Sequence, residues 1–441
     1  MPIPKLLISM SLPMIMSMLV QALYNVVDSM FVAQLNENAL TAVSLAFPIQ
    51  NLMIAVAAGT GVGINALLSK SLGEKKFETA NTIAKNGILL GILSSLVFAI
   101  LGLLGSRLFF EIQTKDAQII EYGTQYKSVI TIVSFGIFLQ ITFERLLQST
   151  GKTIFNMITQ GMGAIINIIL DPILIFGWFG LPAMGVTGAA VATVIGQIFA
   201  ALLGLFFNYK FNKEIHVSFK GFKPCKETIG NIYKIGVPSI IMQSIGSLTT
   251  FGINNILLMF SSTAATVFGV YFKLQSFVFM PVFGLTNGMI PIVAYNYGAQ
   301  NKKRIYQTIK LSAIIAVGIM LVGLTIFQLF PQTLLGLFEA SDHMLEIGVP
   351  ALRTISLSFV FAGFGIVSSC VFQALGNGVY SMFISLTRQI VVILPVAFIF
   401  ANLFGLNMVW FAYPIAEVVS VFMCIFMLRR ILKTKVKPLA N

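Results

Sequence analysis

The chain has 441 residues, of which 57% are hydrophobic and 10% are charged, and its mean hydropathy is +0.91. Soluble globular proteins carry about 25% charged residues, so this composition excludes a water-soluble fold. A net charge of +13 would indicate nucleic-acid binding in a soluble protein, but in a membrane protein basic residues mostly mark the cytoplasmic side.

Apolar stretches long enough to cross a bilayer as helices follow one another along almost the whole chain. The sequence therefore predicts an all-α membrane protein. The first stretch has Lys5 ahead of it and no small-residue cleavage site after it, so we expect a retained span rather than a signal peptide. Twelve transmembrane helices are expected, at about residues 6–33, 41–68, 86–106, 127–149, 156–178, 184–209, 235–260, 264–291, 311–330, 351–373, 380–404 and 407–428.

The basic residues are distributed unevenly between the two sides of these helices. With the N-terminus inside, 21 of the 28 fall in inner loops, tails and span ends, and four lie at the outer side: Arg107, Lys115, Lys127 and Arg353. This asymmetry predicts the orientation in the membrane, and the even number of spans places both termini in the cytoplasm. The positive charge therefore indicates topology, and no nucleic-acid partner is expected.

The first expected span contains one carboxylate, Asp28, within the stretch "NVVDSMF". A charge inside a span costs at least a few kcal/mol, so Asp28 should face a partner or a water-filled cavity. It lies five residues before the outer end of the span, which is roughly 7 Å below the surface. Pro13 removes a helix hydrogen bond in the same span and is expected to act as a hinge.

The second expected span contains Gly59 and Gly63, a small-xxx-small spacing that allows close packing of helices in lipid. The surrounding "GTGVG" lacks the strand that precedes a dinucleotide-binding loop, and "GKT" at 151–153 lacks the first glycine of a phosphate-binding loop. No ATPase or other cofactor is expected. In the fourth span, Glu144 and Arg145 lie near the inner mouth and are expected to anchor the helix at the interface.

The fifth and sixth expected spans place polar residues at the depth of Asp28. Asp171 and Thr193 lie roughly 10 to 14 Å below the outer surface, and Asn167 precedes Asp171 by one helical turn. These residues can therefore share one pocket with Asp28. Two nearby carboxylates in a medium of low dielectric each favour protonation of the other, which indicates a titrating site. The alternative is a pair of buried carboxylates kept for folding specificity.

The chain is an internal duplication with an offset of 225 residues. We expect a first six-helix bundle at 1–209, a cytoplasmic linker at 210–234, a second bundle at 235–430 and a basic cytoplasmic tail at 431–441. Because each copy has six spans, the copies should be related by a pseudo-two-fold axis along the membrane normal. The second copy has Ile253 in place of Asp28 and Val396 in place of Asp171. Matching pairs include Pro13 with Pro238, Gln50 with Gln275, Gly59 with Gly284, Gly63 with Gly288 and Gly151 with Gly376.

The second copy contains charges of its own within its spans. Arg388 and Glu417 come to similar depth on consecutive spans, and we interpret them as a structural ion pair, with a substrate contact as the alternative. Lys273 lies in the outer half of its span and could be the partner of Glu417 or a gate. Cys225, Cys370 and Cys424 have no paired spacing, so neither a disulfide nor a metal cluster is indicated.

Several segments together resemble the multidrug and toxic compound extrusion (MATE) family. "LPMIMSMLVQALYNVVDSMFVAQL" at 12–35 is similar to its first span, "NIILDPILIFG" at 167–177 to its fifth, "GAAVAT" at 188–193 to its sixth and "PIVAYNYGA" at 291–299 to the end of its eighth. The resemblance covers the whole chain. Spans 7 and 10 lack the acidic residues that some branches use for sodium, a pattern typical of the MepA-like bacterial branch.

The resemblance implies a secondary antiporter of the bacterial cytoplasmic membrane that expels amphipathic, often cationic drugs while H⁺ or Na⁺ enters. It implies a cation-coupling site, with H⁺ or Na⁺ as the ion, at Asp28, Asn167, Asp171 and Thr193. Alternating access between the two halves would expose a cavity with adaptable apolar walls, to which the 39 Phe and 20 Met residues contribute. We expect a monomer that contacts membrane lipids.

Other functions remain open as alternatives. A flippase for lipid-linked sugars from the wider superfamily would favour a more basic cavity, typically with additional spans. An ion channel would need a continuous ring of polar residues along one pore. An embedded hydrolase is disfavoured because the chain has no HExxH, no GxSxG and no Cys/His ligand spacing.

Overall fold

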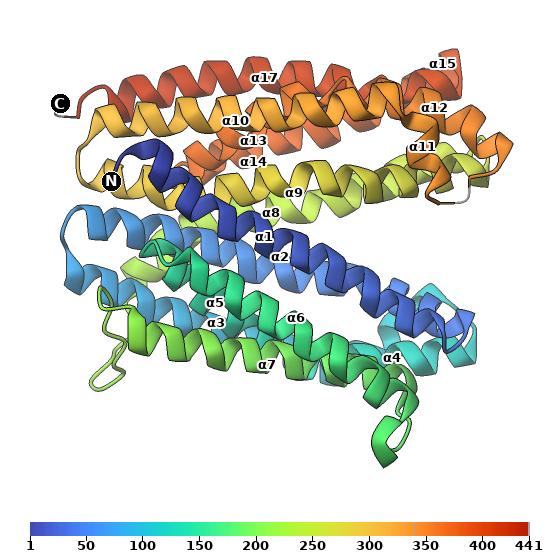
Figure 1. Ribbon diagram of the computed structural model, residues 1–441, viewed down its shortest axis with the longest axis horizontal. Helices are drawn as coiled ribbons and strands as arrows, with labels where there is room; N and C mark the ends of the chain where they lie inside the picture. Colours follow the sequence, from blue (N-terminus) through green and yellow to red (C-terminus); the bar gives the residue numbers. More distant parts are fainter. Residues whose placement is uncertain (339, 440–441) are drawn as a thin grey trace. The chain divides into compact units, whose positions relative to one another are not determined.

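The computed structural model describes residues 1–338 and 340–439, and within them the regular elements are helices (Figure 1). The last two residues of the expected basic tail lie outside the described residues. The helices are α1 (Ile3–Ala33), α2 (Glu37–Gly73), α3 (Phe77–Gln113), α4 (Ala117–Ile132), α5 (Phe135–Ser149), α6 (Thr153–Phe176), η1 (Trp178–Gly180), α7 (Gly185–Phe211), α8 (Lys226–Leu258), α9 (Ser262–Gly298), α10 (Lys302–Leu329), α11 (Pro331–Gly336), α12 (Asp342–Ser356), α13 (Phe359–Ala374), α14 (Gly378–Leu386), η2 (Thr387–Ile393), α15 (Leu394–Phe404), α16 (Leu406–Val409), α17 (Ala412–Ile431) and η3 (Leu432–Val436).

The all-α membrane fold predicted from the sequence is confirmed. In the described residues, nine helices are long and apolar enough to cross a membrane. Two bent pairs, α4 with α5 at 44° and α12 with α13 at 48°, raise the number to eleven if each pair is one span. Helix α8 is the remaining expected span. It has 33 residues, which is long enough, but polar residues such as Gln243 and Asn254 interrupt its apolar sequence.

The duplication is visible in the bounds of the helices. Helices α2 and α9 both have 37 residues, and they begin and end at positions that differ by the 225-residue offset of the repeat. Helices α4 and α12 start at the same offset, and so do α6 and α14. Some starts are fixed by capping side chains: Asn36 accepts a hydrogen bond from the Ala39 N–H, and Ser261 accepts one from the Ala264 N–H.

Contacts between the helices divide the chain into two compact units. The N-terminal unit is Met16–Ile240, and the C-terminal unit is Met1–Ile15 with Ile241–Asn441. The division passes through α1 and α8, two residues after Pro13 and Pro238 respectively. The bundle boundaries expected at residues 209 and 235 concern membrane topology and remain a prediction.

Paired glycines allow close helix contacts inside each unit. A Cβ atom on Gly59 would lie 2.5 Å from Ile240 Cγ1, and one on Gly63 would lie 2.3 Å from the Ile232 carbonyl oxygen. In the C-terminal unit, a Cβ on Gly284 would lie 2.6 Å from the backbone of Ile15. The close packing predicted from the small-xxx-small spacing is therefore present in both copies.

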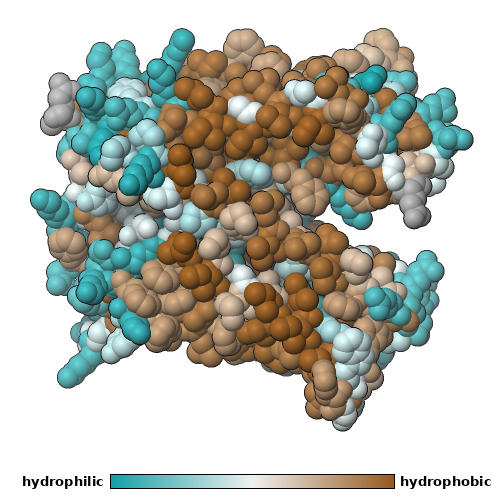
Figure 2. Space-filling model, viewed as in Figure 1, coloured by the Kyte–Doolittle hydropathy of each residue, from teal (hydrophilic) through white to brown (hydrophobic). Residues whose placement is uncertain are grey.

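The exterior of each unit is apolar along the helices and hydrophilic at their ends (Figure 2). Large hydrophobic side chains are exposed on this apolar surface, for example Leu104 at 82% and Phe422 at 71%. Such exposure fits contact with lipid rather than water. In the N-terminal unit, one end carries Lys70, Lys75, Lys76, Lys152 and Lys210 and is called the basic end below.

The buried cores of the two units differ. The C-terminal unit has one large apolar cluster that includes Ile253, Tyr271 and Trp410. The N-terminal unit has separate clusters, one around Leu68 and Leu146 towards the basic end and one containing Tyr126 and Ile175 towards the opposite end. The polar site described next lies in this divided core.

Candidate functional site

The structure brings Asp28 of α1 and Asp171 of α6 together inside the N-terminal unit. Both lie near the end opposite the basic end, and their side chains are buried, with exposed fractions of 9% for Asp28 and 0% for Asp171. The two carboxyl groups lie within hydrogen-bonding distance of each other. A carboxylate only accepts hydrogen bonds, so a hydrogen bond between the two groups forms only when one of them carries a proton.

Asn167 and Thr193 complete the group of residues expected from the sequence. In the orientation that gives both amide atoms of Asn167 a hydrogen-bond partner, Nδ2 donates to Asp171 Oδ2 at 3.0 Å. Oδ1 accepts from the Thr193 backbone N–H at 2.9 Å. The Thr193 hydroxyl lies 3.2 Å from the same amide and donates to the Ala189 carbonyl at 3.0 Å. Asn167 thus connects Asp171 on α6 to Thr193 on α7.

The end of α6 is shaped by two residues. Pro172 follows Asp171 and has no N–H, so the carbonyl of Ile168 loses its helical donor and remains as an acceptor in the same turn. The helix ends at Gly177, which has φ +75°, in the left-handed region that favours glycine. The local sequence therefore ends the helix shortly after the carboxyl group.

Three residues beside the carboxyl pair were missed in the sequence. Tyr24 lies one turn before Asp28 on α1 and within hydrogen-bonding reach of Thr193. Gln50 Nε2 of α2 donates to the Tyr126 hydroxyl of α4 at 2.9 Å, and Tyr126 interacts electrostatically with Asp28. Tyr24 could have been predicted from its position four residues before Asp28 on the same helix, whereas nothing in the sequence marks Tyr126.

The pair has acceptors left for a small cation. In the described part of the chain, Asp28 Oδ1 and Asp171 Oδ1 are buried without a hydrogen-bond partner. A buried polar atom without a partner is costly, so these oxygens are suited to hold a proton or a monovalent ion. Among the described residues, no three His, Cys, Asp or Glu side chains group as metal ligands.

Arg388 and Glu417 form an ion pair in the C-terminal unit, as interpreted from the sequence. Arg388 Nη1 lies 2.6 Å from Glu417 Oε1, and the exposed side-chain fractions are 29% for Arg388 and 8% for Glu417. Arg388 belongs to the π-helical turn η2, in which the Leu394 N–H bonds to the Gln389 carbonyl. Pro395 has no N–H for the Val391 carbonyl, which accounts for the wider turn at this point.

Two other expected charges have different surroundings from those foreseen. Lys273 is not the partner of Glu417, which pairs with Arg388; it is exposed, and its Nζ lies 5.8 Å from the centre of the Phe338 ring. A role of Lys273 as a gate stays a prediction. Glu144 is not an interfacial anchor, because its exposed fraction is 4%. The bend between α4 and α5 and the packing of α5 against its neighbours place this carboxyl inside the unit.

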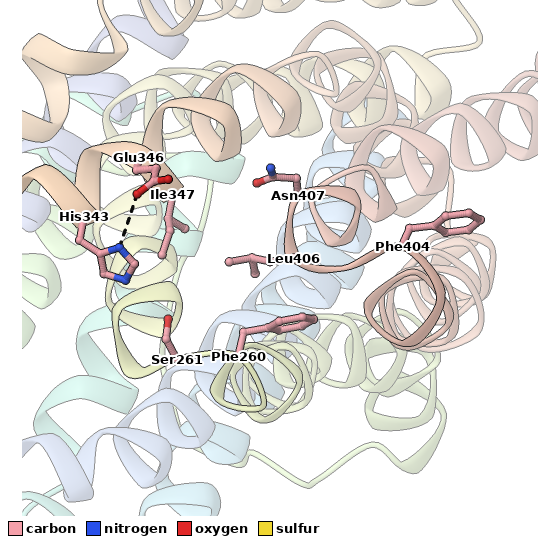
Figure 3. Close-up of a pocket in the computed structure, with 8 residues that line it drawn as sticks. All are labelled: Phe260, Ser261, His343, Glu346, Ile347, Phe404, Leu406 and Asn407. Atoms are coloured by element: carbon pink, nitrogen blue, oxygen red, sulfur yellow. Dashed lines mark ion pairs between the residues drawn. The ribbon is translucent and has the colours of Figure 1, made fainter.

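A surface hollow of about 470 Å³ lies in the C-terminal unit, where α8 meets α9 and near the start of α12 (Figure 3). Its wall is part aromatic, from Phe260 and Phe404, and part polar, from an ion pair of 3.7 Å between His343 and Glu346. Both partners are well exposed, at 60% and 82% of their side chains. The hollow is therefore open at the surface of this unit.

Comparisons with known proteins agree with this architecture. The family model described as MatE matches residues 13–173 and 238–399, one segment in each copy of the repeat. The multidrug export protein MepA of Staphylococcus haemolyticus (strain JCSC1435) is 28% identical over 423 residues, covering 96% of this chain and 92% of that protein.

Solved structures extend the similarity to the fold. A MATE structure in complex with MaL6 has a TM-score of 0.93 and 25% identity, covering 99% of this chain and 98% of that chain. A multidrug resistance MATE family transporter of the MOP superfamily, in an outward-facing conformation, also has a TM-score of 0.93, with 26% identity, and covers 99% of this chain and 97% of that chain.

Proposed function

Because the chain belongs to the MATE (MatE) family of membrane transporters, we propose that it is an antiporter for amphipathic, cationic compounds. The compounds leave the cell while protons enter at Asp28 and Asp171. One observation supports the proton as the ion: the two buried carboxyl groups are neighbours, and they can hydrogen bond to each other once one of them carries a proton. Sodium is the alternative ion, which Asp28, Asn167, Asp171 and Thr193 would hold with their oxygens.

The mechanism is competition between the ion and the cationic compound. An ionised pair attracts a cation, and a pair that has gained a proton attracts it less. Arrival of the proton therefore lowers the affinity for the compound and favours its release. Helix α1 carries both Asp28 and Pro13, which lie 15 residues or about 22 Å apart along the helix. A rearrangement at Asp28 would reach the Pro13 hinge through one element and support alternating access.

The orientation proposed for the protein has both termini in the cytoplasm of a bacterium. This is supported by the basic end of the N-terminal unit and, in the C-terminal unit, by two contacts between the chain ends and α10. Arg304 donates to the Met1 carbonyl at 3.1 Å, and Lys302 to the Lys437 carbonyl at 3.4 Å. A membrane-impermeant thiol reagent should then reach Cys225 of the linker from the cytoplasmic side; reaction from the outside alone would reverse the orientation.

The first prediction concerns Asp28→Asn in proteoliposomes. An amide cannot gain or lose the proton, so we expect efflux of a fluorescent cation to lose its response to an imposed pH gradient. In the wild type, this gradient should sustain a concentration ratio of the cation of at least tenfold per pH unit. The protein should still insert and elute as a single species. Sodium and proton gradients are imposed separately to identify the ion.

The matched control is Glu37→Gln, which changes an exposed carboxylate in the first turn of α2. It should leave gradient-driven efflux at the wild-type rate. If Asp28→Asn retains undiminished efflux driven by either gradient, the assignment of the coupling site is wrong.

A further inference from the structure

Glu144 is a second buried acid of the N-terminal unit, and the mechanism above does not use it. It lies on α5, five residues before that helix ends at Ser149, and therefore towards the basic end. Its exposed fraction is 4%. A carboxylate this deep in a membrane helix is costly unless it is paired, protonated or functional.

The partners of Glu144 are two amides. Gln140 Nε2, one turn earlier on α5, donates to Oε1 at 3.0 Å, and Gln160 Nε2 of α6 donates to Oε2 at 2.8 Å. Glu417 differs because its partner is a guanidinium, that of Arg388 at 2.6 Å. A glutamine amide can donate to a carboxylate through nitrogen or accept from a carboxylic acid through oxygen. Amide partners thus allow both protonation states of Glu144.

An unused acceptor lies beside this carboxyl group. In the described residues, Gln160 Oε1 is a buried oxygen without a hydrogen-bond partner. If Glu144 gains a proton, its O–H can donate to Gln160 Oε1 after rotation of the amide. An acceptor for the O–H of a protonated Glu144 is therefore present at the site.

The same helix repeats this arrangement. Helix α6 carries Gln160 against Glu144 and Asn167 against Asp171, so each acid faces an amide of one helix. The two amides are seven residues apart, which is about 10 Å along α6 and places them on one face. Small residues, Gly163 and Ala164, separate them. A proton gained by Glu144 or by Asp171 can therefore affect the same helix, α6.

The charged side chain that interacts with Glu144 in the described part of the chain is the adjacent Arg145. Its Nη1 donates to Gln148 Oε1 at 2.8 Å, and its aliphatic stem packs against Gly61 of α2. From α6, the side chain that faces the carboxyl group is an amide, Gln160. Arg145 therefore interacts with Glu144 from the adjacent position on α5 and also donates to Gln148.

We infer that Glu144 is a second proton-binding site of the transport cycle, with Gln140 and Gln160 following its protonation state. A proton suits the site because the amides of Gln140 and Gln160, which face the carboxyl group, can donate to a carboxylate or accept from a carboxylic acid. This rests on the proposed antiport function and adds a second proton to each exported cation. Exchange of two protons for one monovalent cation then moves net charge inward, so the membrane potential also drives efflux.

The test is the steady-state gradient of a monovalent fluorescent cation in proteoliposomes, with the membrane potential held at zero by valinomycin and equal potassium. Two protons per cation predict a concentration ratio of about 100-fold per pH unit for the wild type. Glu144→Gln should reduce this to about tenfold, because only the Asp28 and Asp171 pair still exchanges a proton. Glu78→Gln, an exposed acid in the first turn of α3, is the matched control and should retain the wild-type ratio.

The outcomes separate this inference from the proposed function. A wild-type ratio of only about tenfold per pH unit overturns the second site, even if Glu144→Gln does not fold. A Glu144→Gln ratio equal to that of the wild type, or a complete loss of coupling in a folded variant, also overturns it. Failure of the proposed function would instead appear as a full ratio in Asp28→Asn.

Discussion

Asp171 and Glu417 are both buried acids on membrane-spanning helices, yet their neighbours differ. The amide of Asn167 donates to Asp171, and a second carboxyl group lies beside it, so the loss or gain of a proton is compatible with its surroundings. Glu417 instead forms an ion pair with the guanidinium of Arg388 at 2.6 Å. The two acids therefore differ in their partners, which are an amide and a second carboxyl group at Asp171 and a guanidinium at Glu417.

This difference predicts a stability effect in the C-terminal unit. Arg388→Met should destabilise the protein towards the lower end of about 3–5 kcal/mol, because it leaves Glu417 buried without its cation while Arg388 itself is partly exposed. Adding Glu417→Gln should recover most of this loss. The check is thermal unfolding of the purified variants in detergent, and a double variant whose loss equals the sum of the two single losses would show that the pair is not structural.

The residues of the carboxyl pair could be predicted because their depth follows from their distance to the span ends. The sequence predicts a similar membrane depth for Asp28, Asp171 and Thr193 on different helices. The helical spacing then adds Asn167. Tyr126 and Gln50 could not be predicted, because their position depends on how α2 and α4 pack. The burial of Glu144 was also missed, because closeness to a span end indicates depth but not the side that the residue faces.

Helices α1 and α8 each contribute to both compact units, and this exchange is the main feature at the scale of elements. Residues 1–15 pack in the C-terminal unit, and the corresponding start of α8 packs in the N-terminal unit. The repeat explains the reciprocity: Gly59 contacts Ile240, and Gly284 contacts Ile15. The exchange could not be predicted from the span boundaries, which place each helix wholly in one bundle.

The glycine contacts predict a sharp difference between two similar substitutions. Gly59→Ala places a methyl group against the backbone and side chain of Ile240, so we expect a loss of about 1–3 kcal/mol from overpacking. Gly105→Ala on α3 meets no atom within 4 Å and should be neutral or slightly stabilising. Thermal unfolding of both variants in detergent is the measurement, and equal stabilities would show that the Gly59 contact is not close.

The fold of the whole molecule is symmetric, whereas its chemistry is not. Several helices begin at the same offset in both copies of the repeat, but the carboxyl pair belongs to the N-terminal unit and its counterparts in the other copy are Ile253 and Val396. The apolar cluster of the C-terminal unit includes Ile253. We therefore propose that one unit exchanges the ion while the other serves as a packed partner with its own Arg388 and Glu417 pair.

In the proposed mechanism, a proton and a cationic compound compete for the Asp28 and Asp171 pair. Its most direct test is the equilibrium affinity of the purified transporter for a fluorescent cation as a function of pH, at constant sodium. We expect the affinity of the wild type to fall as the pH falls, by up to about tenfold per unit, and the affinity of Asp28→Asn with Asp171→Asn to stay constant. A wild-type affinity that does not change with pH would contradict the proposal.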